Sequence, residues 1–299
     1  MLIMIRGAGD IATGIATRLH RAGFKIVMTE IEKPLAIRRT VCFSEAIGKG
    51  ETTVEGIRAV HVTNRQDLKA VLDSGDIPVL IDPEAKRRKG LRPDVFIDAC
   101  LAKRNLGTDL SFAPIVIGVG PGFTAGVDCH AVIETMRGHS LGRVITEGSA
   151  IPDTKTPGNI GGYTIERLLR TPCAGTFRTV RRIGDIVEAG ETVADVDGMP
   201  VKAQIKGVLR GLLPDGTAVP EGLKCGDVDP RCVVENCNTV SDKALAVGGG
   251  VLEAIMKFAG NPYENNIYPT ATSKNKSEYT QDNLNSRSGW QDLSDETTA

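Results

Sequence analysis

Hydrophobic residues in the first half of the chain recur in short runs, separated by segments of helical spacing. The apolar run 2–5 is followed by a turn with two glycines and then by apolar residues at helical spacing over 11–19, a pattern typical of strand, turn and amphipathic helix. Further strands are predicted at 25–30, 59–62, 78–81, 95–99 and 115–119. Because strands that alternate with helices are typical of a parallel sheet covered on both faces, we predict a Rossmann-like nucleotide- or cofactor-binding domain over residues 1–150.

The pattern changes in the second half, where short apolar runs are broken by Gly-Asp and Asp-Gly turns. The segment 182–190 is echoed by 213–222, which indicates two related β halves. This doubled pattern resembles the barrel-sandwich hybrid of biotinyl and lipoyl carrier domains, but the turn between the halves at 197–200 has no lysine at its tip. We therefore predict a small all-β, barrel-sandwich-hybrid-like domain over residues 151–240, without a swinging arm.

The last 59 residues divide into two parts. Residues 241–260 are predicted to form a C-terminal helical segment with Ser241 as its N-cap. Residues 261–299 are dominated by Asn, Ser, Thr, Asp and Glu, so they cannot bury enough surface to offset the entropy of ordering, and we predict a disordered tail. The predicted fold class is α/β: a Rossmann-like parallel sheet domain, a small barrel-sandwich-hybrid-like domain and a C-terminal helix.

Composition and charge exclude several classes of protein. The formal net charge of the 299 residues is −1, and the chain lacks the basic excess and aromatic platforms of a nucleic-acid binder. It has no run of about 18 apolar residues that would span a membrane, and its apolar start lacks a cleavage region for export. The seven cysteines include no Cys-x-x-Cys pair, so we predict a cytoplasmic protein with reduced thiols and no nucleic-acid or membrane partner.

The first glycine turn has the spacing of a dinucleotide-binding fingerprint. Gly7 would make the turn, Gly9 would let a pyrophosphate approach, and Ala12 would let the helix pack closely on the sheet. Glu30 ends the next strand about 20 residues on, where a ribose-binding acid belongs. Asp10 places a negative charge beside the expected phosphate, so the alternative of a βα unit that binds no dinucleotide stays open.

A second glycine loop follows the buried run at 115–119. It contains Gly118, Gly120 and Gly122, and Thr124 adds a hydroxyl group. Because loops at the carboxyl ends of parallel strands line the ligand crevice, we predict that both glycine loops face one cofactor-binding site. A bare loop without a ligand is the alternative for this segment.

Basic residues are predicted to complete this site. Arg38 and Arg39 follow the second strand as a candidate anion clamp, and Lys103 follows the strand at 95–99. Asp128 and His130 can share one face of a strand, but we identify neither a catalytic residue nor a metal site. The predicted function is therefore the binding of a small anionic ligand.

Six motifs, in order, resemble those of one family. They lie at residues 6–14, 30–41, 118–126, 137–144, 226–231 and 241–254. Over residues 1–260 the chain resembles the YqeB-like accessory proteins of selenium-dependent molybdenum hydroxylases, which are distantly similar to the XdhC-type maturation proteins. The segment 261–299 has none of these motifs.

This resemblance implies a maturation role for xanthine-dehydrogenase-type enzymes, with a molybdenum hydroxylase apoenzyme as partner. The candidate ligands are an anionic nucleotide, NAD(P) or a molybdopterin-type cofactor. The resemblance supplies no catalytic residue, so whether the chain is an enzyme stays open, as does the formation of a homo-oligomer. The alternative is an NAD(P)-dependent oxidoreductase acting on a small carbonyl or alcohol, in which only His130 or His139 could serve as the base. A third hypothesis is a scaffold protein that binds no small ligand.

Overall fold

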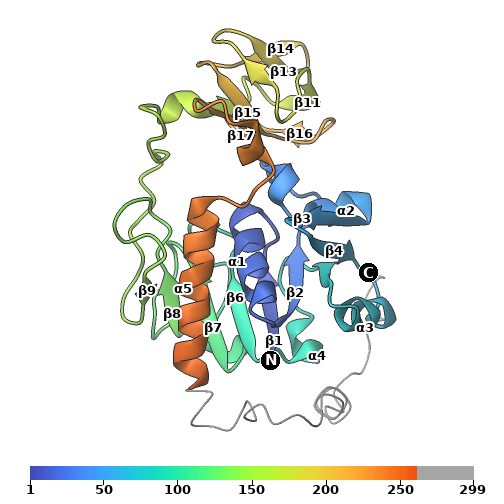
Figure 1. Ribbon diagram of the computed structural model, residues 1–299, viewed down its shortest axis with the longest axis vertical. Helices are drawn as coiled ribbons and strands as arrows, with labels where there is room; N and C mark the ends of the chain where they lie inside the picture. The colour runs from blue at the N-terminus through green and yellow to red at the C-terminus, as the bar shows by residue number, and fades with distance from the viewer. Residues whose placement is uncertain (261–299) are drawn as a thin grey trace.

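The computed structural model describes residues 1–260, which form two bodies stacked end to end (Figure 1). The larger body contains a sheet of nine strands with helices on its faces. The smaller body consists mainly of strands. The disordered tail predicted at 261–299 lies outside the described residues.

The nine-stranded sheet is parallel in its interior and antiparallel at both edges. Its strand order is β3-β4-β5-β2-β1-β6-β7-β8-β9, and the edge strands β3 and β9 run against their neighbours. The strands are β1 (Leu2–Arg6), β2 (Lys25–Glu30), β3 (Glu51–Val54), β4 (Ile57–His61), β5 (Ile77–Ile81), β6 (Val95–Asp98), β7 (Ile115–Val119), β8 (Ala131–Ile133) and β9 (Val144–Ile145). Because β1, β6, β7 and β8 are parallel, their carboxyl ends lie along one edge of the sheet.

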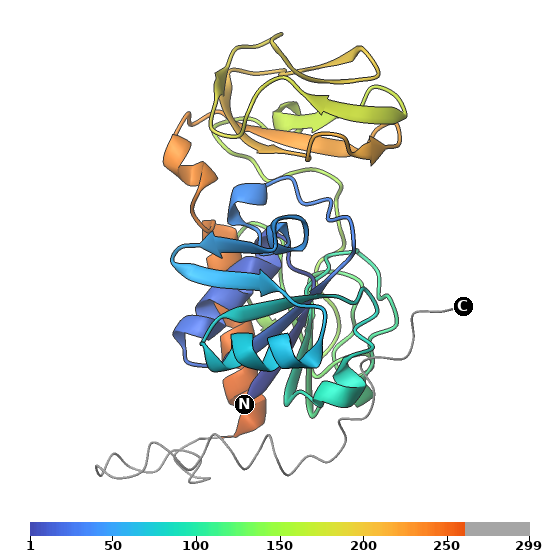
Figure 2. The same ribbon diagram turned by 90° about the vertical axis from the view of Figure 1, so that its right-hand side faces the viewer.

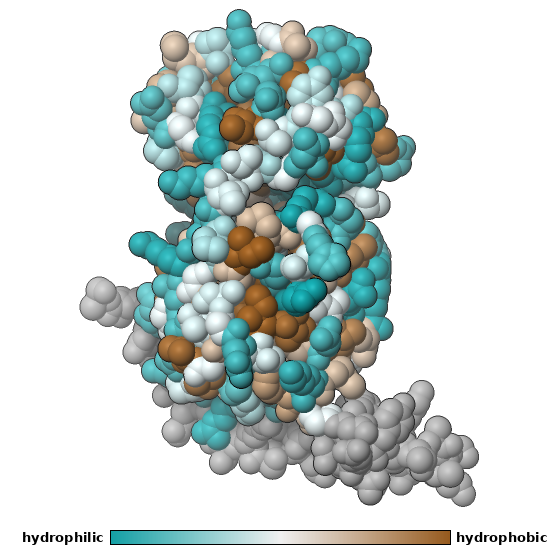
Figure 3. Space-filling model, turned by 90° about the vertical axis from the view of Figure 1, so that its left-hand side faces the viewer, coloured by the Kyte–Doolittle hydropathy of each residue, from teal (hydrophilic) through white to brown (hydrophobic). Residues whose placement is uncertain are grey.

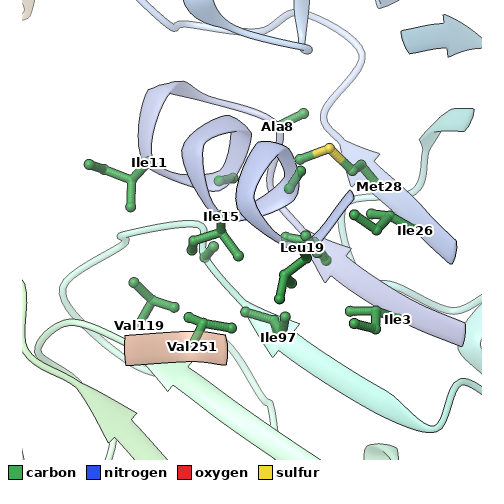
Figure 4. Close-up of a cluster of buried hydrophobic side chains, with 14 of the residues drawn as sticks. Ile3, Ala8, Ile11, Ile15, Leu19, Ile26, Met28, Ile97, Val119 and Val251 are labelled. Atoms are coloured by element: carbon green, nitrogen blue, oxygen red, sulfur yellow. The ribbon is translucent and has the colours of Figure 1, made fainter. Parts of the chain in front are cut away.

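Helices cover both faces of this sheet because its central strands are apolar on both sides. The core on one face includes residues of α1, α2 and α5, and the core on the other includes residues of α3 and α4. Figure 4 shows Ile3 of β1, Ile15 of α1 and Val251 of α5 in the first of these cores. The helices are α1 (Asp10–Arg21), α2 (Glu45–Lys49), α3 (Arg65–Asp73), α4 (Arg88–Leu91) and α5 (Asp242–Ala259).

Helix α5 lies beside α1 and runs in the same direction, with glycines at the contact (Figure 1). A Cβ on Gly14 would lie 2.5 Å from the Cβ of Ala244, and one on Gly248 would lie 3.1 Å from the Gly14 carbonyl oxygen. Ser241 caps α5 by accepting a hydrogen bond from the Ala244 amide. Both helices therefore begin at the edge of the sheet that faces the smaller body.

The smaller body is formed by two four-stranded antiparallel sheets, which pack face to face around a core that includes Phe177 (Figure 2). Their strand orders are β10-β17-β15-β12 and β14-β13-β11-β16. The strands are β10 (Leu168–Arg170), β11 (Gly175–Thr179), β12 (Ile186–Val187), β13 (Thr192–Val196), β14 (Met199–Lys202), β15 (Gly207–Leu212), β16 (Ala218–Val219) and β17 (Lys224–Asp229).

The predicted fold class, a Rossmann-like parallel sheet joined to a barrel-sandwich-hybrid-like domain, was wrong. The large sheet is mixed, only the four-residue α4 joins β5 to β6, and no α-helix joins β6 to β7 or β7 to β8. The smaller body divides into two separate antiparallel sheets. The prediction failed because hydrophobic runs identify buried central strands, but they do not fix the direction of a polar edge strand such as β3 or of the two-residue β9.

Candidate functional site

A cleft of about 580 Å³ lies where the two bodies meet. The sheet body contributes the segments that follow β6, β7 and β8, and the smaller body contributes β10 and the start of β17. The first turn of α5 and the linking segment 151–158 complete the lining. Figure 3 views the molecule from the side that carries β8, β9 and this linking segment, where apolar and hydrophilic side chains lie next to one another at the waist.

The lining of the cleft is strongly basic. Six of its residues are cationic and one is acidic; the cations are Lys103, Arg137, Lys155, Arg170, Lys224 and Lys243. Two of them have an acidic partner: Lys103 lies 2.8 Å from Asp153, and Arg137 donates two hydrogen bonds, of 2.7 and 2.8 Å, to Asp242. Within residues 1–260, the other four cations, Lys155, Arg170, Lys224 and Lys243, have no acidic partner within ion-pair distance, so no ion pair neutralises their charge.

Strand pairing places two of these cations side by side. In the antiparallel ladder between β10 and β17, Arg170 is the register partner of Lys224. Like charges directly opposite one another destabilise a sheet. Arg170 donates one hydrogen bond of 2.8 Å to the Gly222 carbonyl oxygen, which carries no net charge. The strand register therefore places two like charges next to each other at the wall of the cleft.

Lys243 approaches the same position from the other body. It lies in the first turn of α5, where the partial positive charge of the helix N-terminus also disfavours a cation. Burial is the largest cause that lowers the pKa of Lys243, and the neighbouring Arg137 and Lys224 cations lower it further. The pKa of Lys224, which lines the cleft, is also lowered: desolvation is the largest cause, and the neighbouring Arg167 and Arg170 cations lower it further. An anion bound here would offset the desolvation of these lysines, the repulsion between the like charges and the unfavourable position of Lys243 at the helix N-terminus.

Replacing Lys243 by methionine is expected to stabilise the protein. Removal of the cation from the helix N-terminus should raise the free energy of unfolding at pH 7 by about 0.5 kcal/mol. Because the folded-state pKa of Lys243 is lowered, the protonated lysine disfavours folding, and the gain should shrink as the pH rises from that lowered pKa and be lost above about 10.4. Lys257 in the last turn of α5 is the matched control, because Lys257→Met removes a favourable charge–dipole interaction; equal effects of both substitutions in urea denaturation would contradict this account.

The structure brings most residues of the first glycine turn together, but they bind one another. The Ala8 amide of the turn donates a 2.9 Å hydrogen bond to Glu30, whose other oxygen accepts from the Ile31 amide. Asp10 accepts hydrogen bonds of 3.0 and 2.9 Å from Arg38. Glu30, which was predicted to bind a ribose, and Arg38, which was predicted to clamp an anion, are thus engaged with groups of the chain itself.

Arg38 and Arg39, the predicted anion clamp, join the two bodies. Arg38 is buried and donates to the carbonyl oxygens of Asn236 and Thr239, in the segment that leads into α5. Arg39 donates a 2.8 Å hydrogen bond to the Leu212 carbonyl oxygen at the end of β15. Both guanidinium groups are therefore bound to groups of the chain.

The glycines at the start of α1 differ in the space around them. Gly7 has φ +99° and a Cβ there would lie 3.0 Å from the Ala99 carbonyl oxygen, whereas a Cβ on Gly9 would meet nothing within 4 Å. Ala12 is buried in the core beneath α1. Open space therefore lies beside Gly9, although neither glycine lines the cleft.

The second glycine loop supports the wall of the cleft. A Cβ on Gly118 would lie 2.5 Å from the Phe123 ring, and one on Gly122 would lie 2.6 Å from the backbone of Arg104. Gly120 has φ +83° and packs against Thr135, which lines the cleft together with Pro121. These glycines permit close packing of the loop.

The hydroxyl of Thr124 lies 3.1 Å from the Ser149 hydroxyl and does not line the cleft. Asp128 and His130, weighed as chemical groups, likewise lie outside it: Asp128 accepts a hydrogen bond from the Thr124 amide, and Nδ1 of His130 accepts one from the Val116 amide. In residues 1–260, no group of three or more His, Cys, Asp or Glu side chains is placed to hold a metal ion.

All seven cysteines are free. Burial is the largest cause that raises the pKa of Cys129 to about 11. Because the thiolate is the nucleophile, this thiol is held in its unreactive form at neutral pH.

The sequence pattern missed Arg170, Lys224 and Lys243. Arg170 and Lys224 are 54 positions apart, and only the β10–β17 register brings them together. Lys243 could have been found from the sequence, because it follows the N-cap Ser241 and Asp242 in the first turn of a helix, where a positive charge is unfavourable. Lys103, which was predicted near the ligand, does line the cleft.

No protein-family model matches the chain. A search of curated proteins finds YqeB of Escherichia coli K12, described as uncharacterized, at 51% identity over 255 residues. Over these residues the sequence is similar to YqeB. The match covers 85% of this chain and 47% of the relative, so the chain spans about half the length of the YqeB protein that it matches.

Similar solved structures include an aspartoacylase family protein of Mesorhizobium loti, with 11% identity and a TM-score of 0.25, and a succinylglutamate desuccinylase/aspartoacylase of Rhodobacter sphaeroides, with 14% identity and a TM-score of 0.23. Each match covers 76% of this chain and 84% of the other. At TM-scores this low, neither the fold nor the activity of these proteins carries over to the YqeB-like chain. Among residues 1–260, no helix combines the length and apolarity needed to cross a membrane.

Proposed function

We propose that this YqeB-like chain binds a small anionic molecule in the cleft between its two bodies. The observation that carries the proposal is the convergence of Arg170, Lys224 and Lys243 without an acidic partner. An anion at this point would pair with cations from both bodies, in surroundings where partial desolvation strengthens charge-assisted hydrogen bonds. The volume of about 580 Å³ suits a ligand the size of a cofactor or metabolite.

An accessory role in the maturation of selenium-dependent molybdenum hydroxylases is the biological setting that we propose for this site. It comes from the family resemblance, and with it comes a hydroxylase apoenzyme as partner; the cytoplasmic location that we propose rests instead on the cysteine pattern. The similarity to YqeB supports the family name alone. A nucleotide or molybdopterin-type ligand would present phosphate to the three cations; their side chains fit such a group because they retain free N–H donors.

The oxidoreductase alternative has less support from the site. Glu30, which would bind a ribose, accepts hydrogen bonds from two backbone amides, and Asp10 is held by Arg38. The cleft lining contains no histidine, tyrosine or cysteine. The general bases considered for that reaction, His130 and His139, do not line it.

Calorimetric titration with inorganic pyrophosphate tests the proposal. The chain is expected to bind pyrophosphate, and Lys224→Ala and Lys243→Ala are each expected to weaken binding at least tenfold, because each removes a partly desolvated charge from the anion. Lys257→Ala at the far end of α5 is the matched control and should leave the affinity unchanged. Unchanged affinity in both cleft variants, or equal losses in all three, would reject the cleft as the anion site.

A further inference from the structure

Resting on the proposed function, we infer that the ligand is a phosphate monoester attached to a flat apolar group. Its phosphate is held by Arg170, Lys224 and Lys243. Its apolar part lies against the side chains that follow β6, β7 and β8, which are described below. This narrows the ligand from any small anion to one chemical class. It also places the phosphate and the apolar group of the ligand against different walls of the cleft.

The arrangement of the cations favours phosphate over carboxylate. Arg170, Lys224 and Lys243 belong to three different elements, β10, β17 and α5. The three terminal oxygens of a phosphate monoester point in three directions, whereas the two oxygens of a carboxylate lie in one plane on one edge. At pH 7 a phosphate monoester carries a charge of about −1.5 to −2, which also matches several uncompensated cations better than a single negative charge.

Most of the apolar wall comes from the sheet body. Leu101, Pro121 and Met136 line the cleft from the segments after β6, β7 and β8, and Ile151 lines it from the linking segment. Ile151 is 47% exposed, although a large aliphatic side chain gains free energy from burial. An apolar face of the ligand would cover these side chains, and the flexible thioether of Met136 can adapt to a ring.

A buried carboxylate holds this wall in position. Glu134 is 2% exposed, and one of its oxygens accepts hydrogen bonds of 2.7 Å from the amides of Thr135 and Met136. The other oxygen accepts a 2.8 Å hydrogen bond from the Ile151 amide. Two separate segments of the apolar wall are therefore tied to one side chain, which makes the wall a preformed surface.

The distribution of charge and apolar surface disfavours other anions. A single-stranded nucleic acid is bound by stacking on aromatic side chains, and no aromatic residue lines the cleft. In a dinucleotide the pyrophosphate lies between two apolar groups. Here most of the apolar lining comes from the segments after β6, β7 and β8 and from the linking segment, and Leu168 of β10 is buried. The cations Arg170, Lys224 and Lys243 come from β10, β17 and the start of α5.

The test compares four probes with the full-length chain by calorimetry: AMP, adenosine, inorganic phosphate and succinate. AMP is expected to bind at least tenfold more tightly than phosphate, and adenosine and succinate more weakly than phosphate. Arg170→Met should weaken AMP and phosphate alike. Ile151→Ser should weaken AMP at least threefold and leave phosphate unchanged, because it alters only the apolar wall.

The outcomes separate this inference from the proposed function. Equal binding of AMP and phosphate, both lost in Arg170→Met, would overturn the apolar part of the ligand and leave the anion site intact. If succinate binds more tightly than AMP and phosphate, and this binding is lost in Arg170→Met, the ligand is not a phosphate monoester, but the anion site stands. Failure of AMP, phosphate and succinate to bind would overturn the inference together with the proposed function.

Discussion

Replacing Gly250 by alanine is expected to lower the free energy of unfolding by about 3 kcal/mol or more. A Cβ at this position of α5 would lie 2.0 Å from the Gly142 carbonyl oxygen and 3.0 Å from a methyl group of Ile133. Gly142 has little room to move, because it is itself packed closely on α5: a Cβ added to it would lie 2.6 Å from the Ala246 carbonyl oxygen. The added methyl group must therefore push α5 away from the sheet, which urea denaturation would detect.

The neighbouring Gly249 is the matched control. A Cβ there would meet only the end of the Arg18 side chain, at 3.9 Å. Gly249→Ala should therefore raise the free energy of unfolding by about 0.5–1 kcal/mol, because alanine loses less backbone entropy in a helix than glycine does. A stable Gly250→Ala variant, or a destabilised Gly249→Ala variant, would contradict the packing of α5 described here.

Replacing Arg38 by methionine is expected to cost about 3 kcal/mol of stability, the loss typical when one partner of a buried ion pair is removed. Arg38 is 7% exposed and binds Asp10 in the sheet body. It also binds the carbonyl oxygens of Asn236 and Thr239. The variant leaves a carboxylate and two carbonyl groups without their donor at the junction of the two bodies.

Two comparisons make this second prediction specific. Arg21 forms an exposed ion pair with Glu55, so Arg21→Met should cost less than about 1 kcal/mol. The Asp10→Ala and Arg38→Met substitutions should cost less together than the sum of their separate effects, because each removes the same interaction. Additive losses in denaturant unfolding would show that Arg38 does not act through Asp10.

Much of the local structure followed from the sequence. The apolar run at 2–5 and the helical spacing at 11–19 predicted β1 and α1, whose observed bounds are Leu2–Arg6 and Asp10–Arg21. Ser241 was predicted as an N-cap, and α5 begins directly after it. These features are local, since they depend on neighbouring residues and on the periodicity of burial.

The fold class could not be read in the same way. The edge strand β3 (Glu51–Val54) is mostly polar and partly exposed, so it leaves no apolar run. The smaller body repeats its turn pattern, but its two sheets are defined by pairings between distant strands, such as β10 with β17 and β11 with β16. Local turn signals do not determine such pairings.

The candidate site shows the same division. Glycine loops indicated the edge of the sheet where the cleft lies, yet their own residues serve packing and internal hydrogen bonds. The uncompensated cations come from long-range register and from the start of α5. The sequence feature that indicated anion binding most directly was a lysine, Lys243, in the first turn of a helix, where a positive charge is unfavourable.

The most direct test of the anion site is a crystal structure of the chain with arsenate, a tetrahedral anion whose position is given by anomalous scattering. The account predicts arsenate in the cleft, with its oxygens about 2.7–3.2 Å from the nitrogen atoms of Arg170, Lys224 and Lys243. Arsenate bound at the Gly7–Asp10 turn, with the cleft left empty at saturating concentration, would contradict it.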